Sequence, residues 1–199
     1  VHEYGGKFIS DEVQTGAGRC EGDFLITKSL GIKADMITMA KGLGNGAAIG
    51  AILMDEESSA GLEGKVHFNT FGGDPFQTVQ AKITMDIIKE EKLADNAVAM
   101  GKRLMDGLKQ LMNEHELIGD VRGRGLLMGM ELVKDRKTKE HASAETAELM
   151  DRCKDHGLLL GKGGLKGNVL RIAPPLTVNA EQVDEMISTI DRSLHEMKA

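Results

Sequence analysis

At residues 35–46 the chain reads Asp35-Met36-Ile37-Thr38-Met39-Ala40-Lys41-Gly42-Leu43-Gly44-Asn45-Gly46. The apolar run at the centre of this segment predicts a short buried strand that stops at a polar residue, Lys41. A similar run that ends at Asp11 and a third at residues 49–54 predict two more strands. Because helical patterns follow, these strands indicate an α/β fold with a mostly covered sheet.

The first clear helix is predicted to start at Asp74-Pro75. Aspartate can cap the free amides of a helix, and proline at the first helical position loses no hydrogen bond. The apolar stripe of this helix comprises Phe76, Val79, Ile83 and Ile87. Apolar residues at three- and four-residue steps predict a second helix, which starts at Leu93 and ends near His115.

A second, smaller α+β unit is predicted beyond this helix. Residues 119–125 are rich in glycine and arginine, and the cluster at residues 123–125 is typical of a tight turn. The remaining pattern predicts strands at residues 126–133, 158–160 and 169–172, a helix capped by Ser143 and reaching Asp155, and a last helix that starts at Asn179. The expected domains are therefore residues 1–92 and 93–199.

The composition is that of an ordinary globular protein, with 199 residues, 41% of them hydrophobic, and a net charge of −6. An acidic chain with five Phe, one Tyr and no Trp is not expected to bind nucleic acid. No apolar run approaches the roughly 18 residues of a membrane helix, so no membrane association is expected. Neither the cysteines, Cys20 and Cys153, nor the histidines show the spacing of a metal site or a disulfide framework.

Two polar residues end predicted strands, and both are candidates for chemistry. In open α/β sheets the groups just beyond the carboxyl ends of strands face the ligand crevice, which is where Asp11 is expected. Lys41 follows a wholly apolar strand, so we expect it to be partly desolvated, which favours the neutral, nucleophilic amine. The glycines after Lys41 match neither GxxxxGK nor GxGxxG. A solvated acid and an ordinary surface lysine are the alternative interpretations, and the residues alone leave both open.

Two further residues are candidates for binding anions. Thr70 lies in a glycine-ended loop before the helix that starts at Asp74, where a hydroxyl and free amides suit a phosphate. A simple capping loop is the alternative. Arg171 interrupts an apolar strand, which is costly unless its guanidinium meets an anion, and a carboxylate fits it in a bidentate manner. A structural salt bridge would also explain Arg171.

Taken together, several segments resemble the class III pyridoxal-phosphate aminotransferases: Asp11-Glu12-Val13-Gln14-Thr15-Gly16-Ala17-Gly18-Arg19, Thr38-Met39-Ala40-Lys41-Gly42 and Asn45-Gly46. Residues 67–73, 119–126 and 171–175 resemble the alanine–glyoxylate branch of that family. The resemblance extends from about Gly6 to the C-terminus. It implies a fold-type-I transferase of which this chain is the C-terminal half, with the end of the large domain at residues 1–92 and the α+β small domain at residues 93–199.

The resemblance implies pyridoxal phosphate as the cofactor and a role for each residue of the first two segments. Lys41 would hold the cofactor covalently and move the proton of the substrate α-carbon. Asp11 would pair with the pyridine nitrogen. Val13 would pack against the cofactor ring, and Gln14 would hydrogen-bond its phenolic oxygen.

The remaining roles concern the substrate and a neighbouring subunit. Thr70 would bind the cofactor phosphate of the neighbouring subunit, which implies a homo-oligomer, a dimer or a dimer of dimers, with a shared active site. Arg171 would bind the substrate α-carboxylate. The implied reaction moves an amino group from an amino acid, alanine, to a 2-oxo acid, glyoxylate, and the implied location is the mitochondrion. Acetylornithine, ornithine and 4-aminobutyrate transaminases, a pyridoxal-phosphate phospho-lyase and a non-catalytic truncated interaction module remain alternatives.

Overall fold

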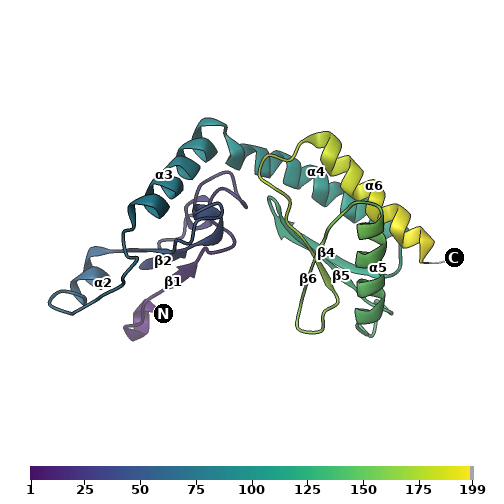
Figure 1. Ribbon diagram of the computed structural model, residues 1–199. Coiled ribbons are helices and arrows are strands. Elements are labelled where there is room, and N and C mark those ends of the chain that lie inside the picture. Colours follow the sequence, from purple (N-terminus) through teal and green to yellow (C-terminus); the bar gives the residue numbers. More distant parts are fainter. Residues whose placement is uncertain (198–199) are drawn as a thin grey trace. The chain divides into compact units, whose positions relative to one another are not determined.

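The computed structural model describes residues 1–197, which fall into two units, residues 1–95 and residues 96–197 (Figure 1). The division lies three residues beyond the boundary expected from the sequence, within the first turn of α4 (Leu93–Glu114). No helix of the described residues combines the length and the apolar character needed to cross a bilayer.

Unit 1 is built on a three-stranded sheet of β1 (Ile9–Asp11), β2 (Met36–Met39) and β3 (Ala51–Met54), in that order. β1 runs parallel to β2, and β3 runs antiparallel to it. The shorter elements of the unit are η1 (His2–Tyr4), α1 (Ile26–Ser29), η2 (Lys41–Leu43) and α2 (Glu56–Ala60). The three predicted strands are confirmed.

The expectation of a mostly covered sheet is wrong for this chain. Ile9 of β1 and Ile52 and Leu53 of β3 remain exposed, because the elements of unit 1 provide only a small core around Met39 and Leu43. Three or more strands with one covered face are ordinarily needed for independent stability. We infer that this sheet depends on further protein surface for its burial.

The predicted start of α3 (Pro75–Glu90) is confirmed, with Asp74 as the cap. Its side chain accepts hydrogen bonds from the amides of Phe76 and Gln77. The helix buries a different face from its apolar stripe, since Ala81 and Ile88 are buried while the stripe residues Phe76, Val79, Ile83 and Ile87 are exposed. The apolar stripe therefore remains uncovered by residues 1–197.

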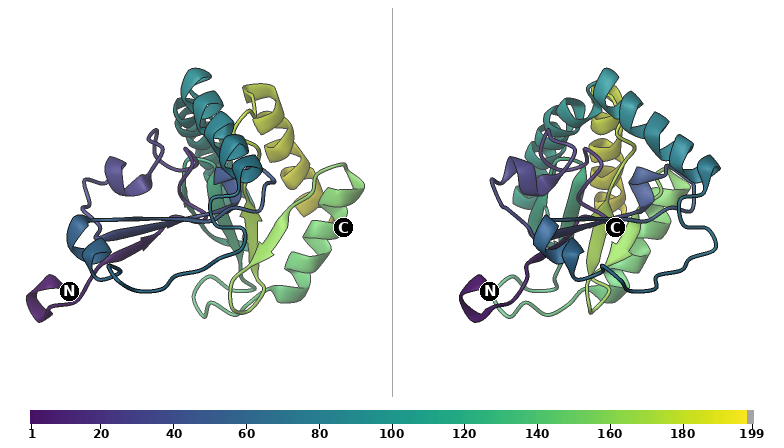
Figure 2. Two further views of the ribbon diagram at one scale, coloured as in Figure 1. Left: turned by 60° about the vertical axis from the view of Figure 1, so that its left-hand side comes forward. Right: turned by 90° about the vertical axis from the view of Figure 1, so that its left-hand side faces the viewer.

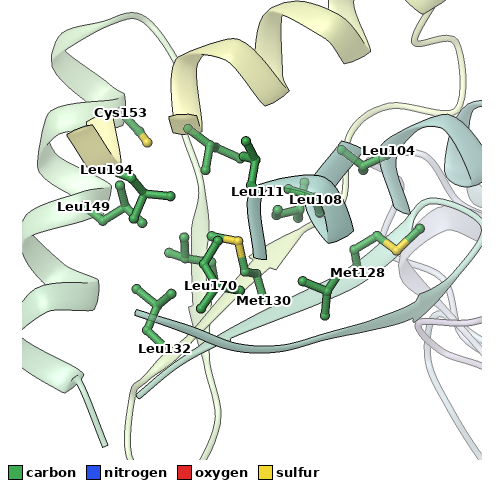
Figure 3. Packing of buried hydrophobic residues seen from close by; sticks show 14 of the residues in the cluster. Leu104, Leu108, Leu111, Met128, Met130, Leu132, Leu149, Cys153, Leu170 and Leu194 are labelled. Carbon is green, nitrogen blue, oxygen red and sulfur yellow. The ribbon is translucent and has the colours of Figure 1, made fainter. Parts of the chain in front are cut away.

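Unit 2 packs three helices on one face of an antiparallel sheet. The strands are β4 (Ile118–Arg124), β5 (Leu127–Leu132), β7 (Val169–Ile172) and β6 (Gly161–Gly163), in that spatial order. α4, α5 (Ser143–Asp155) and α6 (Ala180–Glu196) direct leucines onto the sheet, as Figure 3 shows, and α5 and α6 lie side by side (Figure 1, Figure 2). A fully buried leucine stabilises the fold by about 1.5–3 kcal/mol, so this core holds unit 2 together.

The sequence predictions for unit 2 hold for most elements and fail at two. The capping box of α6, Asn179 with Gln182, is confirmed. Ser143 does not cap α5, because it is the first helical residue and its hydroxyl donates to the Lys166 carbonyl. The strand predicted at residues 158–160 lies instead at β6, three residues later.

The tight turn predicted at residues 123–125 lies at Gly125 and Leu126, where β4 and β5 join in a hairpin, and the glycine- and arginine-rich segment before it is strand up to Arg124. Val121 faces the core, and Arg122 faces outward, where it forms ion pairs with Asp120 and with Glu131 of β5. Gly119 lies so close to Val133 that a Cβ atom would come within 2.5 Å of its side chain. The glycine therefore serves strand packing and not a turn.

Candidate active site

The two residues that end the predicted strands lie at one edge of the unit 1 sheet. Asp11 is the last residue of β1, opposite Thr38 of β2, and Lys41 follows the end of β2 by two residues. Because β1 and β2 are parallel, their carboxyl ends share this edge. Open α/β sheets bind ligands outside the carboxyl ends of their strands, which is the position of these two residues.

Two hydrogen bonds hold the Asp11 carboxylate in place. Its Oδ1 atom accepts from the Val13 amide at 3.1 Å and from the Thr38 hydroxyl at 3.2 Å. Its Oδ2 atom has no hydrogen-bond partner within residues 1–197, and the side chain is exposed. One oxygen is thus fixed while the other is available to a ligand. Val13 is half-buried and Gln14 is exposed in the same turn.

Glu12, which the sequence analysis did not single out, is the buried anchor of this turn. Only 2% of the residue is exposed. Its Oε2 atom accepts from the Ile26 amide at 2.8 Å, and its Oε1 atom accepts from the Thr27 amide at 3.0 Å and the Thr27 hydroxyl at 2.6 Å. The carboxylate therefore ties the turn after Asp11 to the start of α1. An acidic residue directly after a strand-ending aspartate is the signal that could have identified it.

Lys41 begins η2 with a backbone φ of 47°, in the left-handed region that residues other than glycine seldom adopt. Such strain persists only where the surroundings impose it, and it concentrates at functional sites. Here the turn is fixed from α3, where the Gln80 side chain donates to the carbonyls of Gly44 at 2.9 Å and Asn45 at 3.3 Å. The expected desolvation is not provided by this chain, because Lys41 is exposed.

Thr70 lies apart from this edge, in the segment at residues 61–73, which is exposed throughout. The free helix amides expected near it are already occupied, since the Asp74 side chain accepts from the first amides of α3. A phosphate near Thr70 would therefore depend on its hydroxyl and on groups outside α3.

Arg171 lies in unit 2 on β7, between Gly129 of β5 and Gly161 of β6. Because both cross-strand neighbours lack side chains, the guanidinium is not crowded on its face of the sheet. Arg171 has no ion pair or side-chain hydrogen bond within residues 1–197, which contradicts the alternative of a structural salt bridge there. It lines a pocket with Leu160 and Pro174. The guanidinium is free to bind a carboxylate.

A family model described as aminotransferase class-III matches residues 1–194. The chain belongs to the class-III aminotransferase family. Alanine–glyoxylate aminotransferase 2 homolog 2, mitochondrial, of Arabidopsis thaliana is 45% identical over 197 residues, which is 99% of this chain and 41% of that protein. Ethanolamine-phosphate phospho-lyase homolog 1 of Caenorhabditis elegans is 37% identical over 198 residues, which is 98% of this chain and 42% of that protein.

The structural comparison agrees with the family. A crystal structure of a Bacillus anthracis aminotransferase superposes with a TM-score of 0.91 at 35% identity, covering 98% of this chain and 46% of that one. The predicted family and the fold of a pyridoxal-phosphate-dependent transferase are thereby confirmed. The class-III aminotransferase chain spans about two fifths of the length of the curated relatives it matches.

Pyridoxal phosphate is the cofactor of class-III aminotransferases, and the sheet edge fits it. The cofactor needs an amine to hold it and an acid to face its ring nitrogen. Lys41 and Asp11 carry groups of these two kinds at the ends of the same pair of parallel strands, and one oxygen of Asp11 has no partner among the described residues. Substrates of this family are small amino acids and 2-oxo acids, so carboxylate recognition by a free arginine is also in keeping with it.

Proposed function

We propose that the complete protein is a pyridoxal-phosphate-dependent transaminase that moves the amino group of an amino acid, alanine, to a 2-oxo acid, glyoxylate. The observation that carries the proposal is the convergence of Asp11 and Lys41 on the edge shared by β1 and β2. The choice of alanine and glyoxylate is supported by the resemblance of residues 67–73, 119–126 and 171–175 and by the 45% identity to the Arabidopsis relative.

In this proposal each residue has a task set by its position. Lys41 would hold the cofactor through its amine, and as a free amine it would take the proton from the substrate α-carbon. Asp11 keeps the ring nitrogen protonated through its free Oδ2 atom. Val13 packs on the ring, and Gln14 donates to its phenolic oxygen. When bound, pyridoxal phosphate supplies the electron sink for the electron pair left on the α-carbon.

The substrate carboxylate and the cofactor phosphate are assigned to the two remaining candidates. Arg171 binds the α-carboxylate, a role supported by its lack of any partner in the described residues. Thr70 binds the phosphate of a cofactor held by a neighbouring subunit, which makes the protein a homo-oligomer with shared active sites. The exposure of residues 61–73 supports a partner surface there. We place the protein in mitochondria because the Arabidopsis relative carries that designation.

The decisive experiment measures cofactor attachment in the full-length protein. Wild type should show a protein-bound absorption band with pyridoxal phosphate that disappears on addition of alanine. Lys41→Ala should lack the band, while Lys33→Ala, which removes another exposed lysine of unit 1, should keep it. A band that survives in Lys41→Ala would refute the proposal. If the 199-residue chain lacks the band and the full-length protein has it, the missing part of the subunit is required.

A phospho-lyase is the second candidate, because the Caenorhabditis relative bears that name at 37% identity. The two activities differ in their products. A transaminase yields glycine from glyoxylate only when an amino donor is present, whereas a phospho-lyase releases inorganic phosphate and ammonia from ethanolamine phosphate. Phosphate release that depends on Lys41, without glycine formation, would favour the second candidate over the first.

A further inference from the structure

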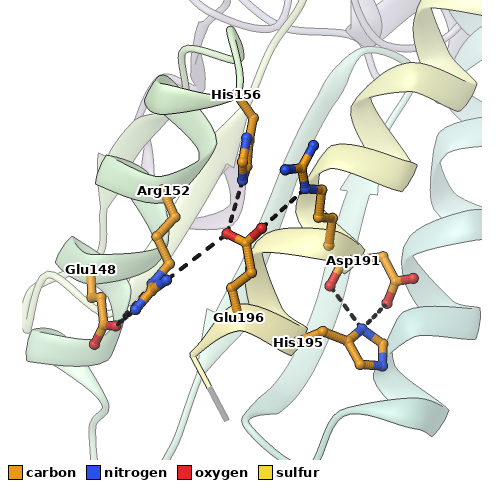
Figure 4. Close-up of polar contacts among 7 residues, drawn as sticks. Glu148, Arg152, His156, Asp191, His195 and Glu196 are labelled. Atoms are coloured by element: carbon orange, nitrogen blue, oxygen red, sulfur yellow. Dashed lines mark hydrogen bonds and ion pairs between the residues drawn. The ribbon is translucent and has the colours of Figure 1, made fainter. Parts of the chain in front are cut away.

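Three side chains with metal-binding atoms converge in unit 2, and none of them is a residue assigned above. His115 directly follows α4, and Asp191 and His195 lie one turn apart on α6. The Nε2 atom of His115 is 2.6 Å from Oδ1 of Asp191, and the Nδ1 atom of His195 is 3.2 Å from the same oxygen. All three ligand atoms lie within 4.8 Å of one another. Figure 4 shows the His195 ring turned toward Asp191.

The backbone around His115 is fixed before any ligand arrives. The side chain is fully buried, and its amide donates to the Leu111 carbonyl at 2.9 Å. Its carbonyl accepts from the Ile118 amide at 3.1 Å and from the Arg136 guanidinium at 2.9 Å. One ligand is therefore held rigidly, as a binding site requires.

The two ligands on α6 are able to adjust. Asp191 and His195 are four residues apart, so they lie on one face of the helix. The His195 side chain is 61% exposed and that of Asp191 is 34% exposed. Tetrahedral coordination with bonds of about 2.0–2.1 Å places neighbouring ligand atoms roughly 3.3 Å apart. The His115–Asp191 distance must therefore widen, and the two imidazole nitrogens, at most 4.8 Å apart, must come to about the same separation. The His195 Nδ1 atom must also leave its 3.0 Å contact with the Asp191 carbonyl, and the partly exposed side chains of Asp191 and His195 can make these movements.

The site is accessible and its carboxylate is not taken by a cation. Both ion pairs that Asp191 makes within residues 1–197 are with the two histidines, and no lysine or arginine of that range is among its partners. A groove between α4 and α6, lined by Asp191, Glu114 and Ser188, leads to it. The Glu114 carboxylate adds negative charge along this path.

We propose that His115, Asp191 and His195 form a binding site for a divalent transition-metal ion of the zinc class. Two imidazole nitrogens and one carboxylate oxygen are a donor set suited to zinc and its neighbours, with the fourth position left to water. Binding replaces the protons that these nitrogens share with Asp191, so the metal enters as protons leave.

The affinity expected is moderate. A metal-bound imidazole ordinarily donates its other N–H to an acceptor. The Nδ1 atom of His115 is buried and has no hydrogen-bond partner in the described residues, so this support is missing. We therefore expect micromolar binding that clamps α4 to α6, and not a metal required for folding.

The test is titration of the tag-free full-length protein with Zn²⁺ by calorimetry, and with Co²⁺ by visible absorption. Wild type should bind one Zn²⁺ with micromolar affinity and unfold at a higher temperature in its presence. His195→Gln should weaken binding at least tenfold and abolish the thermal shift. The matched control His141→Gln, which alters another exposed histidine of unit 2, should behave as wild type.

Two outcomes would overturn the proposal: no saturable binding to wild type, or unchanged binding in His195→Gln. Asp191→Asn provides a second variant, since it keeps the side-chain volume but weakens a carboxylate ligand. Because His195 is exposed, its substitution should not unfold the chain, so the result remains interpretable if Asp191→Asn does. These readouts do not involve the cofactor or the transaminase activity.

Discussion

Glu12→Gln should loosen the turn that carries Asp11, Val13 and Gln14. The glutamate accepts three hydrogen bonds from Ile26 and Thr27 in a site that is 2% exposed. Glutamine has the same size, but its amide group would replace one of the two accepting oxygens with a donor. Either the Ile26 amide or the Thr27 groups would then face a donor without an acceptor.

The size of the effect can be worked from these contacts. A hydrogen bond to a charged group contributes about 1.5–3 kcal/mol, and a buried donor left without an acceptor costs about 1–3 kcal/mol. We expect Glu12→Gln to cost about 3 kcal/mol of local stability. Thr27→Val removes only the hydroxyl donor and should cost about 1.5 kcal/mol.

Hydrogen exchange at the amides of Ile26 and Thr27 measures this local stability directly. Every 1.4 kcal/mol is a factor of ten, so exchange should accelerate roughly 100-fold in Glu12→Gln and roughly tenfold at the Ile26 amide in Thr27→Val. The amide of Ile88, buried in α3, is the internal control. Equal exchange rates in Glu12→Gln and wild type, or a larger effect in Thr27→Val, would refute the anchoring role.

Three further substitutions test other parts of the fold and of the candidate site. Gly101→Ala should destabilise by about 2 kcal/mol in urea unfolding, because its Cβ would lie 2.2 Å from a backbone oxygen. Gly107→Ala, whose Cβ would meet only side-chain atoms of Ile187 and which gains helix propensity, should cost less. Glu196→Gln should lower the free energy of unfolding at pH 7 but not in acid, because the hydrogen-bonded neighbours of Glu196, His156 first, lower its pKa in the folded protein (Figure 4). The stability that the carboxylate contributes is full above its ordinary pKa and is lost as pH falls through the folded-state pKa. An equal difference in stability between variant and wild type at pH 7 and pH 3 would contradict this. In full-length enzyme, Arg171→Ala should raise the KM for a carboxylate substrate at least about 30-fold and leave the cofactor band intact, and an unchanged KM would remove Arg171 from the site.

Local features of the fold were predictable wherever the stabilising contact lies within a few residues. Asp74 caps α3 through amides two and three residues away, and Asn179 and Gln182 satisfy each other across one turn. The strands ending at Asp11 and near Lys41 follow from apolar runs. Such features can be predicted from the sequence, because the residues that make each contact lie within one short segment.

Predictions failed where the partner is distant. The strand predicted at residues 158–160 lies three residues later, where β6 pairs with β7. The apolar stripe of α3 is typical of a buried face, but none of the described residues covers Phe76 or Ile83, which are exposed. Whether a side chain is buried depends on which other part of the protein packs against it, and the periodicity of a sequence does not identify that part.

The helix caps and the strand ends, with Asp11 and Lys41 at two of those ends, could be predicted from the amino-acid sequence alone. Each of these features depends on residues that are neighbours in the sequence. Tertiary structure alone decided that Glu12 is buried against α1, that Arg171 stands between two glycines without a partner, and that His115 meets residues of α6. His115 and Asp191 are 76 positions apart, and only the packing of α4 and α6 in one core brings their side chains together.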